Sequence, residues 1–196
     1  MSEGDDRERL ARLCSAAPGA ADADAREALR ELYDKYARAV ATFAERLLGE
    51  RAGAEDVLQE TFLAVARRPD SFRAPPGARG PEGDAAVRAW LLTIAANRVR
   101  DELRRRERRR RREGAVARPP AVELDTPGGA GDPRLEAALA RLPGTLRAAL
   151  HLRFAEELTH AQVAAVLGVS LRTAKDWSRR GLEALRASMT DDEEDR

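Results

Sequence analysis

The most strongly charged feature of the sequence is an arginine-rich run. Residues 98–112 contain ten arginines against Asp101, Glu102 and Glu107, which gives a local net charge of +7. A helix with this density of arginine can bind nucleic-acid phosphates, because each neutralised phosphate releases condensed counterions. Such contacts supply affinity without selecting a sequence. The alternative interpretation is a solvated, frayed helix end.

A second pattern, over residues 159–181, predicts a helix-turn-helix. Thr159 and Ser170 suit the N-caps of two successive helices, and Gly168 between them suits the left-handed backbone of a tight turn. The second helix of this motif enters the DNA major groove. Arginine and lysine donate there to guanine, and aspartate accepts from cytosine. The candidates for its outward face are Arg172, Thr173, Lys175, Asp176, Arg179 and Arg180. The alternative is an ordinary helical hairpin with a charged surface.

Residue types that carry catalysis or bind metals are sparse. Cys14 is the only cysteine, and His151 and His160 are the only histidines. The sequence has no Gly-rich phosphate loop, and its carboxylates have no neighbouring nucleophile or base. We therefore expect no enzyme, no metal site and no cofactor. Cys14 is interpreted as an incidental thiol rather than a redox sensor.

The composition of the whole chain conceals the distribution of charge. Its 196 residues carry 35 Lys and Arg against 34 Asp and Glu, for a formal net charge of +1. Acidic termini, residues 1–27 and 190–196, offset the arginine run. An aromatic content of 4% disfavours a β-sandwich or barrel. No apolar run could span a membrane and the N-terminus is unlike a signal peptide, so we expect a cytoplasmic protein.

Apolar residues recur at helical spacing in two separate parts of the chain. The first part predicts helices near residues 28–48, 54–68 and 85–106, enough to bury one small core. Helical patterning resumes at 134 and lasts to about 187. The fold predicted is all-α, with two small helical domains joined by a flexible linker.

The boundaries follow from changes in composition. Residues 1–27 show no strong apolar periodicity and are expected to form a variable N-terminal extension. The first domain spans 28–112, with a proline- and glycine-rich loop at 74–84. Residues 113–133 form the linker, which reaches at most about 70 Å, roughly two turns of DNA. The second domain spans 134–188, and 189–196 is an acidic tail.

Two stretches together resemble the bacterial sigma-70 family of RNA polymerase sigma factors. Residues 53–108, with AEDVLQETFLAVAR and AWLLTIAANRVRDELRRRER, are similar to sigma region 2. Residues 135–187, with LTHAQVAAVLGVS and RTAKDWSRRGLEALR, are similar to region 4. A chain with only these two regions and a short linker resembles the extracytoplasmic-function (ECF) group.

The resemblance implies an alternative sigma factor that directs promoter-specific transcription initiation. Region 2 would dock on the β′ clamp helices of core RNA polymerase, recognise the −10 element and assist melting by capturing unstacked bases. Region 4 would contact the β flap and read the −35 element. An anti-sigma factor is a further implied partner, and membrane insertion is not implied. The alternative function is a helix-turn-helix regulator that acts without polymerase docking, which the AEDVLQETF segment disfavours.

The resemblance also assigns residues to each contact. The polymerase-binding residues would be Asp56, Gln59, Glu60 and Phe62. The −10 region would be contacted by Phe72, Asn97, Arg98, Asp101, Arg104 and Arg105, with Arg100 as a further arginine for the backbone phosphates. The −35 region would be read by the six outward residues of the helix-turn-helix, Arg172, Thr173, Lys175, Asp176, Arg179 and Arg180. Trp90 either faces the opening duplex or packs in the core, and for Trp177 we favour core packing.

The chain departs from the family pattern at two places. The loop after residues 70–72, which resembles the −10 specificity loop, is enlarged by residues 74–84. The recognition helix has Asp176, Trp177 and Ser178 where relatives more often have a serine, a basic residue and an apolar residue. The promoter sequence code is therefore not transferred from the family.

Overall fold

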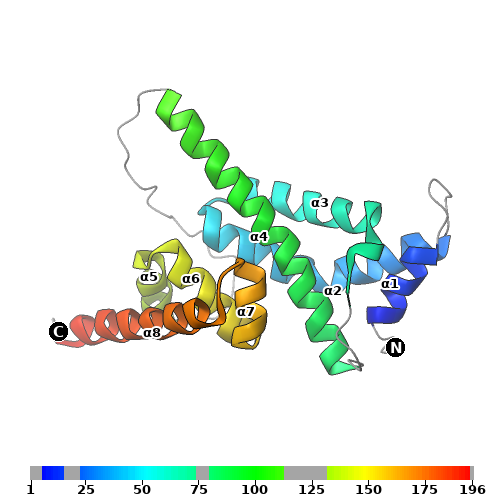
Figure 1. Ribbon diagram of the computed structural model, residues 1–196. Coiled ribbons are helices and arrows are strands. Elements are labelled where there is room, and N and C mark those ends of the chain that lie inside the picture. The colour runs from blue at the N-terminus through cyan, green and yellow to red at the C-terminus, as the bar shows by residue number, and fades with distance from the viewer. Residues whose placement is uncertain (1–5, 16–22, 74–79, 113–131, 195–196) are drawn as a thin grey trace.

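The structure, a computed structural model, describes residues 6–15, 23–73, 80–112 and 132–194. No strand occurs within these ranges, and the prediction of an all-α fold is confirmed. The first part of the chain forms α1 (Asp6–Ser15), α2 (Ala23–Leu48), α3 (Arg51–Arg67), the short 3-10 turn η1 (Pro69–Ser71) and α4 (Pro81–Arg112). The second part forms α5 (Pro133–Arg141), α6 (Gly144–Leu150), the π-helical turn η2 (His151–Ala155), α7 (His160–Leu167) and α8 (Leu171–Glu194) (Figure 1).

Helix α1 lies in the segment expected to be an extension outside the helical core. That expectation is wrong for residues 6–15, because Leu10 and Leu13 are 3% and 7% exposed and belong to the buried core. Two apolar residues in a ten-residue helix give too short a pattern for periodicity to detect. Helix α1 packs on α2 and α4 and also touches η1.

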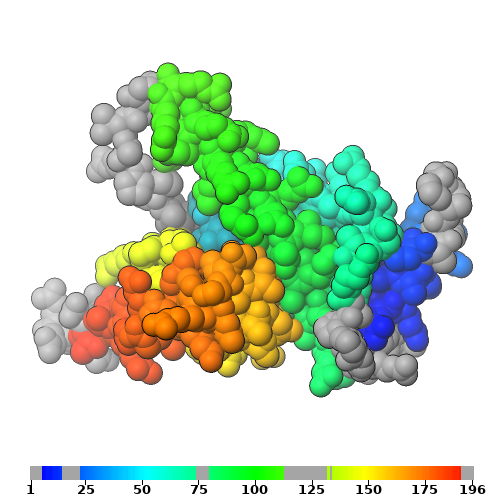
Figure 2. Space-filling view, in the orientation of Figure 1, coloured from blue at the N-terminus to red at the C-terminus, as the bar shows by residue number. Residues whose placement is uncertain are grey.

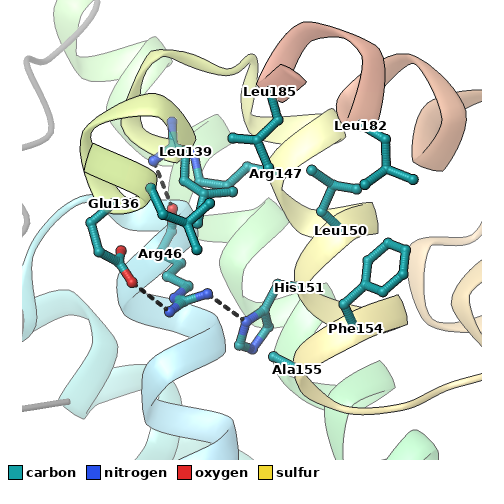
Figure 3. A pocket seen from close by; sticks show the side chains of 11 residues that line it. Arg46, Glu136, Leu139, Arg147, Leu150, His151, Phe154, Ala155, Leu182 and Leu185 are labelled. Atoms are coloured by element: carbon teal, nitrogen blue, oxygen red, sulfur yellow. Dashed lines mark hydrogen bonds and ion pairs between the residues drawn. The ribbon is translucent and has the colours of Figure 1, made fainter. Parts of the chain in front are cut away.

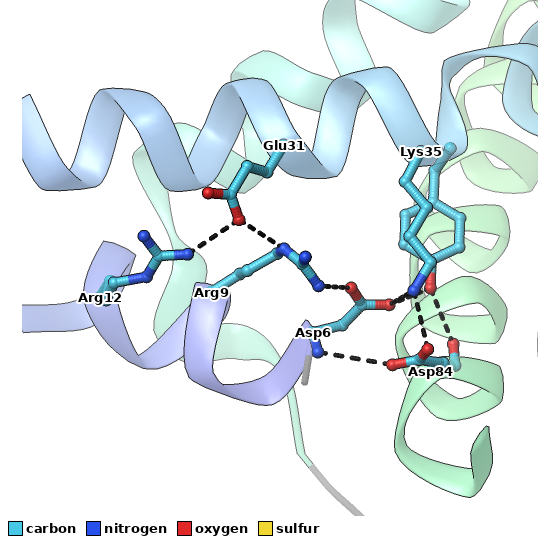
Figure 4. A network of polar contacts seen from close by, with 7 residues as sticks. Asp6, Arg9, Arg12, Glu31, Lys35 and Asp84 are labelled. Atoms are coloured by element: carbon cyan, nitrogen blue, oxygen red, sulfur yellow. Dashed lines mark hydrogen bonds and ion pairs between the residues drawn. The ribbon is translucent and has the colours of Figure 1, made fainter. Parts of the chain in front are cut away.

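A buried carboxylate fixes the position of α1 (Figure 4). Asp6 is fully buried, and it accepts hydrogen bonds from Lys35 Nζ at 2.8 Å, from Arg9 Nη1 at 2.6 Å and from the Tyr36 hydroxyl. Its backbone N–H donates to Asp84 Oδ1 at 3.4 Å, which ties α1 to the first turn of α4. Burial and the Asp6 carboxylate together raise the pKa of Tyr36. Because each buried polar group has a partner, α1 can be held without an uncompensated charge.

Helix α4 is the longest element and packs against both domains. It begins at Pro81, inside the loop expected over 74–84, of which residues 74–79 lie outside the described part. Val87, Leu91 and Ala95 on this helix are fully buried. Its C-terminal turns project away from the other helices (Figure 1). The later part of the arginine-rich run, residues 104–112, therefore forms an exposed arm.

The helix-turn-helix is present as predicted. Thr159 caps α7 through its hydroxyl, and the Gln162 side chain accepts in return from the Thr159 backbone N–H at 2.8 Å, which completes a capping box. Gly168 ends α7 with a φ of 65°, the left-handed conformation that favours glycine. Ser170 Oγ accepts from the Thr173 N–H at 3.1 Å and caps α8.

Packing inside the second domain settles two questions left by the sequence. Trp177 is partly buried and packs against the core, as favoured. Ser178 is 3% exposed, and its hydroxyl donates to the Ala174 carbonyl at 2.9 Å, so this polar residue occupies a core position with its bond satisfied. Helix α8 continues to Glu194, into the segment expected to be an acidic tail.

The two domains pack directly on each other. Helix α7 lies against α4, and α6 lies against α2. Buried residues of both domains form one continuous cluster, and the space-filling view shows no open cleft between the green and orange surfaces (Figure 2). The expected linker, apart from Asp132 and Pro133 at the start of α5, lies outside the described residues. None of the helices described is long and apolar enough to cross a membrane.

A close helix crossing positions the recognition helix. A Cβ on Gly181 of α8 would lie 2.9 Å from Leu150 Cγ and 3.0 Å from Leu150 Cδ1, so only glycine permits this approach to α6. We expect Gly181→Ala to lower the free energy of unfolding by about 1–3 kcal/mol, because the methyl group overpacks the crossing. Urea denaturation followed by circular dichroism measures the change.

Gly144→Ala is the matched control for this crossing. A Cβ on Gly144 would meet nothing within 4 Å, and glycine-to-alanine changes at compatible helical positions stabilise by about 0.4–1 kcal/mol. Equal effects of the two substitutions would contradict the proposed role of Gly181.

Candidate nucleic-acid and polymerase interface

The recognition helix α8 presents an exposed, charged face. Of the six residues expected on it, Arg172, Lys175, Arg179 and Arg180 are exposed, and Thr173 and Asp176 are partly exposed. Arg179 lies between two carboxylates: its Nη2 is 2.8 Å from Asp176 Oδ1 and its Nη1 is 2.7 Å from Glu183 Oε1. The hydrogen bond from Arg179 lowers the pKa of Asp176. Glu183 was not predicted, although its spacing four residues after Arg179 is a readable ion-pair signal.

Five of the six residues expected at the −10 element, all except Phe72, lie on α4. Asn97, Asp101, Arg104 and Arg105 are all exposed. Arg104 Nη1 is 3.9 Å from Asp101 Oδ1, an exposed pair that contributes little to stability. This face therefore has an amide for base contacts and guanidinium groups for phosphates.

One polar groove joins the expected polymerase-binding and −10 residues. Helices α3 and α4 enclose about 420 Å³ between them. Asp56, Gln59 and Glu60 line it from α3, and Arg98, Asp101 and Arg105 line it from α4. Arg98 Nε is 3.4 Å from Glu60 Oε2. The structure therefore places two sets of residues that the sequence treated separately on adjoining sides of the same surface.

The two phenylalanines expected at contacts are less accessible. Phe62 is 6% exposed and packs edge-on against Tyr33, with ring centroids 4.9 Å apart. Phe72 is partly buried and lies edge-on to Trp90 at 5.4 Å. Beside Phe62, Tyr33 and Leu63 are 42% and 51% exposed and border an apolar depression. Leu63 is a large apolar residue of α3 that is exposed to solvent. The sequence analysis did not single it out, because the apolar periodicity of this helix follows the face that contains Phe62.

Arg106 differs in role from its neighbours in the arginine run. Its Nε donates to Glu102 Oε1 at 3.0 Å and its Nη1 to the Leu48 carbonyl at 3.3 Å, and its Nη2 pairs with Glu50. A Cβ on Gly53 would fall 2.6 Å from that Nη2, so the absence of a side chain there leaves room for the guanidinium. Arg106 thus fastens the base of the arm to the turn between α2 and α3. Nothing in a run of consecutive arginines distinguishes it.

A set of polar bonds crosses the seam between the domains, which we define as the contact of α2 and α4 with α6, η2 and α7 (Figure 3). Arg46 of α2 donates to His151 Nδ1 at 3.2 Å and to Glu136 Oε1 at 3.4 Å. The same residues border an apolar cavity of about 330 Å³ that also includes Leu139, Leu182 and Leu185.

A buried arginine strengthens this seam. Arg147 is 7% exposed and donates to the Arg46 carbonyl at 3.0 Å and to the Leu142 and Ala140 carbonyls at the end of α5. Burial, with a smaller contribution from Arg46, lowers the pKa of Arg147. The carbonyls at a helix C-terminus carry partial negative charge, which makes them suitable partners for a cation.

Two arginines of α4 also bond across the seam. Arg88 Nη1 donates to the Glu156 carbonyl at 3.3 Å, and Arg100 Nη2 donates to the Val166 carbonyl at 3.4 Å, beside the turn of the helix-turn-helix. Helix α4 is therefore joined to the second domain by polar bonds at two places along its length.

Comparison with known families agrees with these two units. Residues 32–109 match the model of sigma-70 region 2, and residues 138–187 match the model of sigma-70 region 4. The chain is 36% identical over 177 residues to ECF RNA polymerase sigma factor SigL of Mycobacterium tuberculosis, covering 87% of this chain and 93% of that protein. It is 33% identical over 169 residues to RNA polymerase sigma factor CarQ of Myxococcus xanthus, covering 83% and 89%.

Two solved structures share the fold. The sigma factor RpoE from Bartonella quintana, in complex with the anti-sigma factor NepR, matches with a TM-score of 0.66 and 23% identity, covering 82% of this chain and 96% of that chain. CnrH, in complex with the cytosolic domain of CnrY, matches with a TM-score of 0.61 and 23% identity, covering 95% and 98%.

The partners of Arg106 predict an effect on stability. We expect Arg106→Ala to lower the free energy of unfolding by about 1 kcal/mol, because several charged hydrogen bonds on a partly exposed side chain are lost. Arg108 is an exposed arginine of the same run, and Arg108→Ala removes the same charge. We expect this substitution to change the free energy of unfolding by less than about 0.5 kcal/mol. Chemical denaturation compares the two, and a larger effect of Arg108→Ala would refute the fastening role.

The seam predicts a local change in dynamics. Arg46→Ala removes the bonds to His151 and Glu136 but keeps the carbonyl that Arg147 uses. We expect amide hydrogen exchange in α6 to become about fivefold faster, the factor that corresponds to about 1 kcal/mol of lost bonding. Arg111→Ala, which breaks an exposed pair with Glu107 on the arm, is the control. Unchanged exchange in α6 after Arg46→Ala would show that packing alone holds the seam.

Proposed function

The chain belongs to the sigma-70 family, in its ECF group, and we propose that it is an alternative sigma factor that binds core RNA polymerase and directs promoter-specific initiation. The observation that carries the proposal is the combination in one chain of an exposed recognition helix with a second basic helix that adjoins a docking helix. A regulator that binds only an operator has no use for a second basic helix that adjoins a docking helix. The proposed role is not catalytic, because phosphodiester chemistry belongs to the polymerase.

We assign recognition of the −35 element to α8. The caps at Thr159 and Ser170 and the left-handed Gly168 give α7 and α8 the form of a helix-turn-helix, whose second helix enters the major groove. Arg172 and Thr173 lie at its first turn, where phosphate contacts are expected. Lys175, Arg179 and Arg180 lie further along, where base edges are reached.

We assign recognition of the −10 element to α4 and the adjoining loop. Asn97 has the paired donor and acceptor that recognise an adenine edge, and Arg98, Arg104 and Arg105 supply charge for the phosphates of the strand. Asp101 lies among them and Phe72 lies beside Trp90, so both remain candidates for contacts to an extruded base. Binding energy from captured bases would offset a melting cost of about a few kcal/mol per base.

We place the polymerase contacts on both domains. Asp56, Gln59 and Glu60 on α3 would meet the β′ clamp helices, and the exposed Leu63 adds apolar area to that surface. Phe62 is buried in this structure and would support the helix from within. Leu139, Leu182 and Leu185, which border the apolar cavity from the second domain, form the surface we assign to the β flap.

We propose in addition that the chain is controlled by an anti-sigma factor. RpoE of Bartonella quintana and CnrH share this fold; RpoE has been solved in complex with the anti-sigma factor NepR, and CnrH in complex with the cytosolic domain of CnrY. In this chain the seam packs the two domains against each other. An anti-sigma factor would need only to bind this closed arrangement in order to keep the two domains from binding separate promoter elements.

Reconstituted transcription tests the proposed function. Core polymerase and the full chain are mixed on a library of genomic promoters, and transcript start sites are mapped. We expect a defined set of promoters that core polymerase alone does not use. Absence of such transcripts, together with failure to co-purify with core polymerase, would refute it; DNA binding without core binding would indicate the helix-turn-helix regulator instead.

Substitution in α8 separates the two domains' roles. We expect the double change Lys175→Ala and Arg179→Ala to reduce initiation at −35-dependent promoters by at least about tenfold, because each good base contact contributes about 1–3 kcal/mol of discrimination. Core binding, measured by co-purification, should be unchanged. Arg186→Ala, an exposed charge further along α8, is the control. Loss of core binding in the double variant would contradict this division of labour.

A further inference from the structure

The recognition helix has two carboxylates on the same face as its basic residues. Asp176 lies three residues before Arg179 and Glu183 lies four residues after it, so the three side chains are neighbours on α8. Arg179 Nη2 donates to Asp176 Oδ1 at 2.8 Å, and Nη1 donates to Glu183 Oε1 at 2.7 Å. The side chains stay 60%, 41% and 56% exposed for Arg179, Asp176 and Glu183. The cluster therefore lies on the outer face of the helix.

The two carboxylates reduce the attraction of this arginine for phosphate. Phosphate binding depends on net positive charge, since its free energy comes from released counterions. Arg179 with Asp176 and Glu183 has a formal local charge of −1, and Arg180 Nη1, 3.6 Å from Asp176 Oδ2, is also partly neutralised. Arg179 in the middle of the face is thus a poor ligand for a phosphate at an arbitrary position on DNA.

Hydrogen bonding to a base is not reduced in the same way. An arginine has five N–H donors in a planar fork, and the two carboxylates engage two of them, one on each terminal nitrogen. Guanine O6 and N7 are uncharged acceptors that match two donors of this fork. Because the carboxylates fix the side chain from both sides along the helix, less conformational freedom is lost when it meets the base.

We propose that Asp176 and Glu183 are positioning residues, which hold Arg179 for a bidentate contact with a guanine of the −35 duplex and weaken its contacts with phosphates elsewhere. This inference rests on the proposed role of α8 as the −35 reader. Asp176 then acts through Arg179 and is not itself the acceptor for a cytosine amine, the role that its residue type suggested from the sequence.

Two measurements on the full chain test the proposal. The first is base preference at each −35 position, from transcription by the reconstituted holoenzyme on promoters with a randomised −35 region. The second is the affinity of the chain alone for a duplex without promoter sequence, over a series of salt concentrations. The variant is the double change Asp176→Asn and Glu183→Gln, which keeps side-chain shape and removes both charges. Arg179→Ala identifies the position that Arg179 reads.

We expect the double variant to bind non-promoter duplex about three- to tenfold more tightly, because three exposed ion pairs that compete with phosphate are lost. The log–log salt dependence should become steeper by about one counterion. Preference for guanine at the position identified by Arg179→Ala should fall. Glu107→Gln, which removes a carboxylate from the exposed pair with Arg111 on the α4 arm, is the matched control and should leave the guanine preference unchanged.

The outcomes separate this inference from the proposed function. A wild-type holoenzyme with no −35 preference would refute both. A normal wild-type preference that the double variant retains would overturn the positioning role alone. A preference for cytosine lost in Asp176→Asn, with the guanine preference intact, would also overturn it, because Asp176 would then read a base directly.

Discussion

Helix α4 must bury apolar side chains against two domains at once, and the other features of the molecule depend on this constraint. Its Val87, Leu91 and Ala95 fill the core of the first domain, and it also packs against α7 of the second. A helix buried on more than one side has little surface left for charged residues. Its charged residues therefore lie on the narrow face beside α3, on the projecting arm, or at the polar contacts that Asp84, Arg88 and Arg100 make with neighbouring elements.

The same constraint sorts the arginines, which composition cannot separate. Arg106 is engaged by Glu102 and Glu50 and fastens the arm. Arg88 and Arg100 donate to carbonyls of the second domain. Arg147 donates to the carbonyls at the end of α5 rather than to a carboxylate. A positive charge in sequence is thus a candidate for DNA binding only after the structural bonds are assigned.

Much of the fold could be predicted from local pattern, whereas contacts between distant residues could not. The helix-turn-helix follows from Thr159, Gly168 and Ser170, whose roles are decided within a few residues. Helix α1 was missed because its apolar pattern is short and its position is fixed by bonds from Asp6 to Lys35 and Tyr36, residues of another helix. The groove that brings Glu60 to Arg98 likewise depends on how α3 and α4 cross. At the candidate site, the charged residue types could be identified from the sequence. The ion pairs that they form with one another could not.

The seam has a consequence for binding that follows from its composition. It combines a shared apolar cluster with polar bonds from a few arginines, a mixture typical of interfaces that open and close. The outer face of α8 and the groove beside α3 are exposed in this closed arrangement, so each domain can meet its own ligand before the seam opens. If the two proposed DNA elements can be bound together only when the domains part, the apparent affinity for both is reduced by the fraction of molecules that remain closed. On the proposed function, a partner that stabilises the seam would then lower joint binding without covering either of the two exposed surfaces.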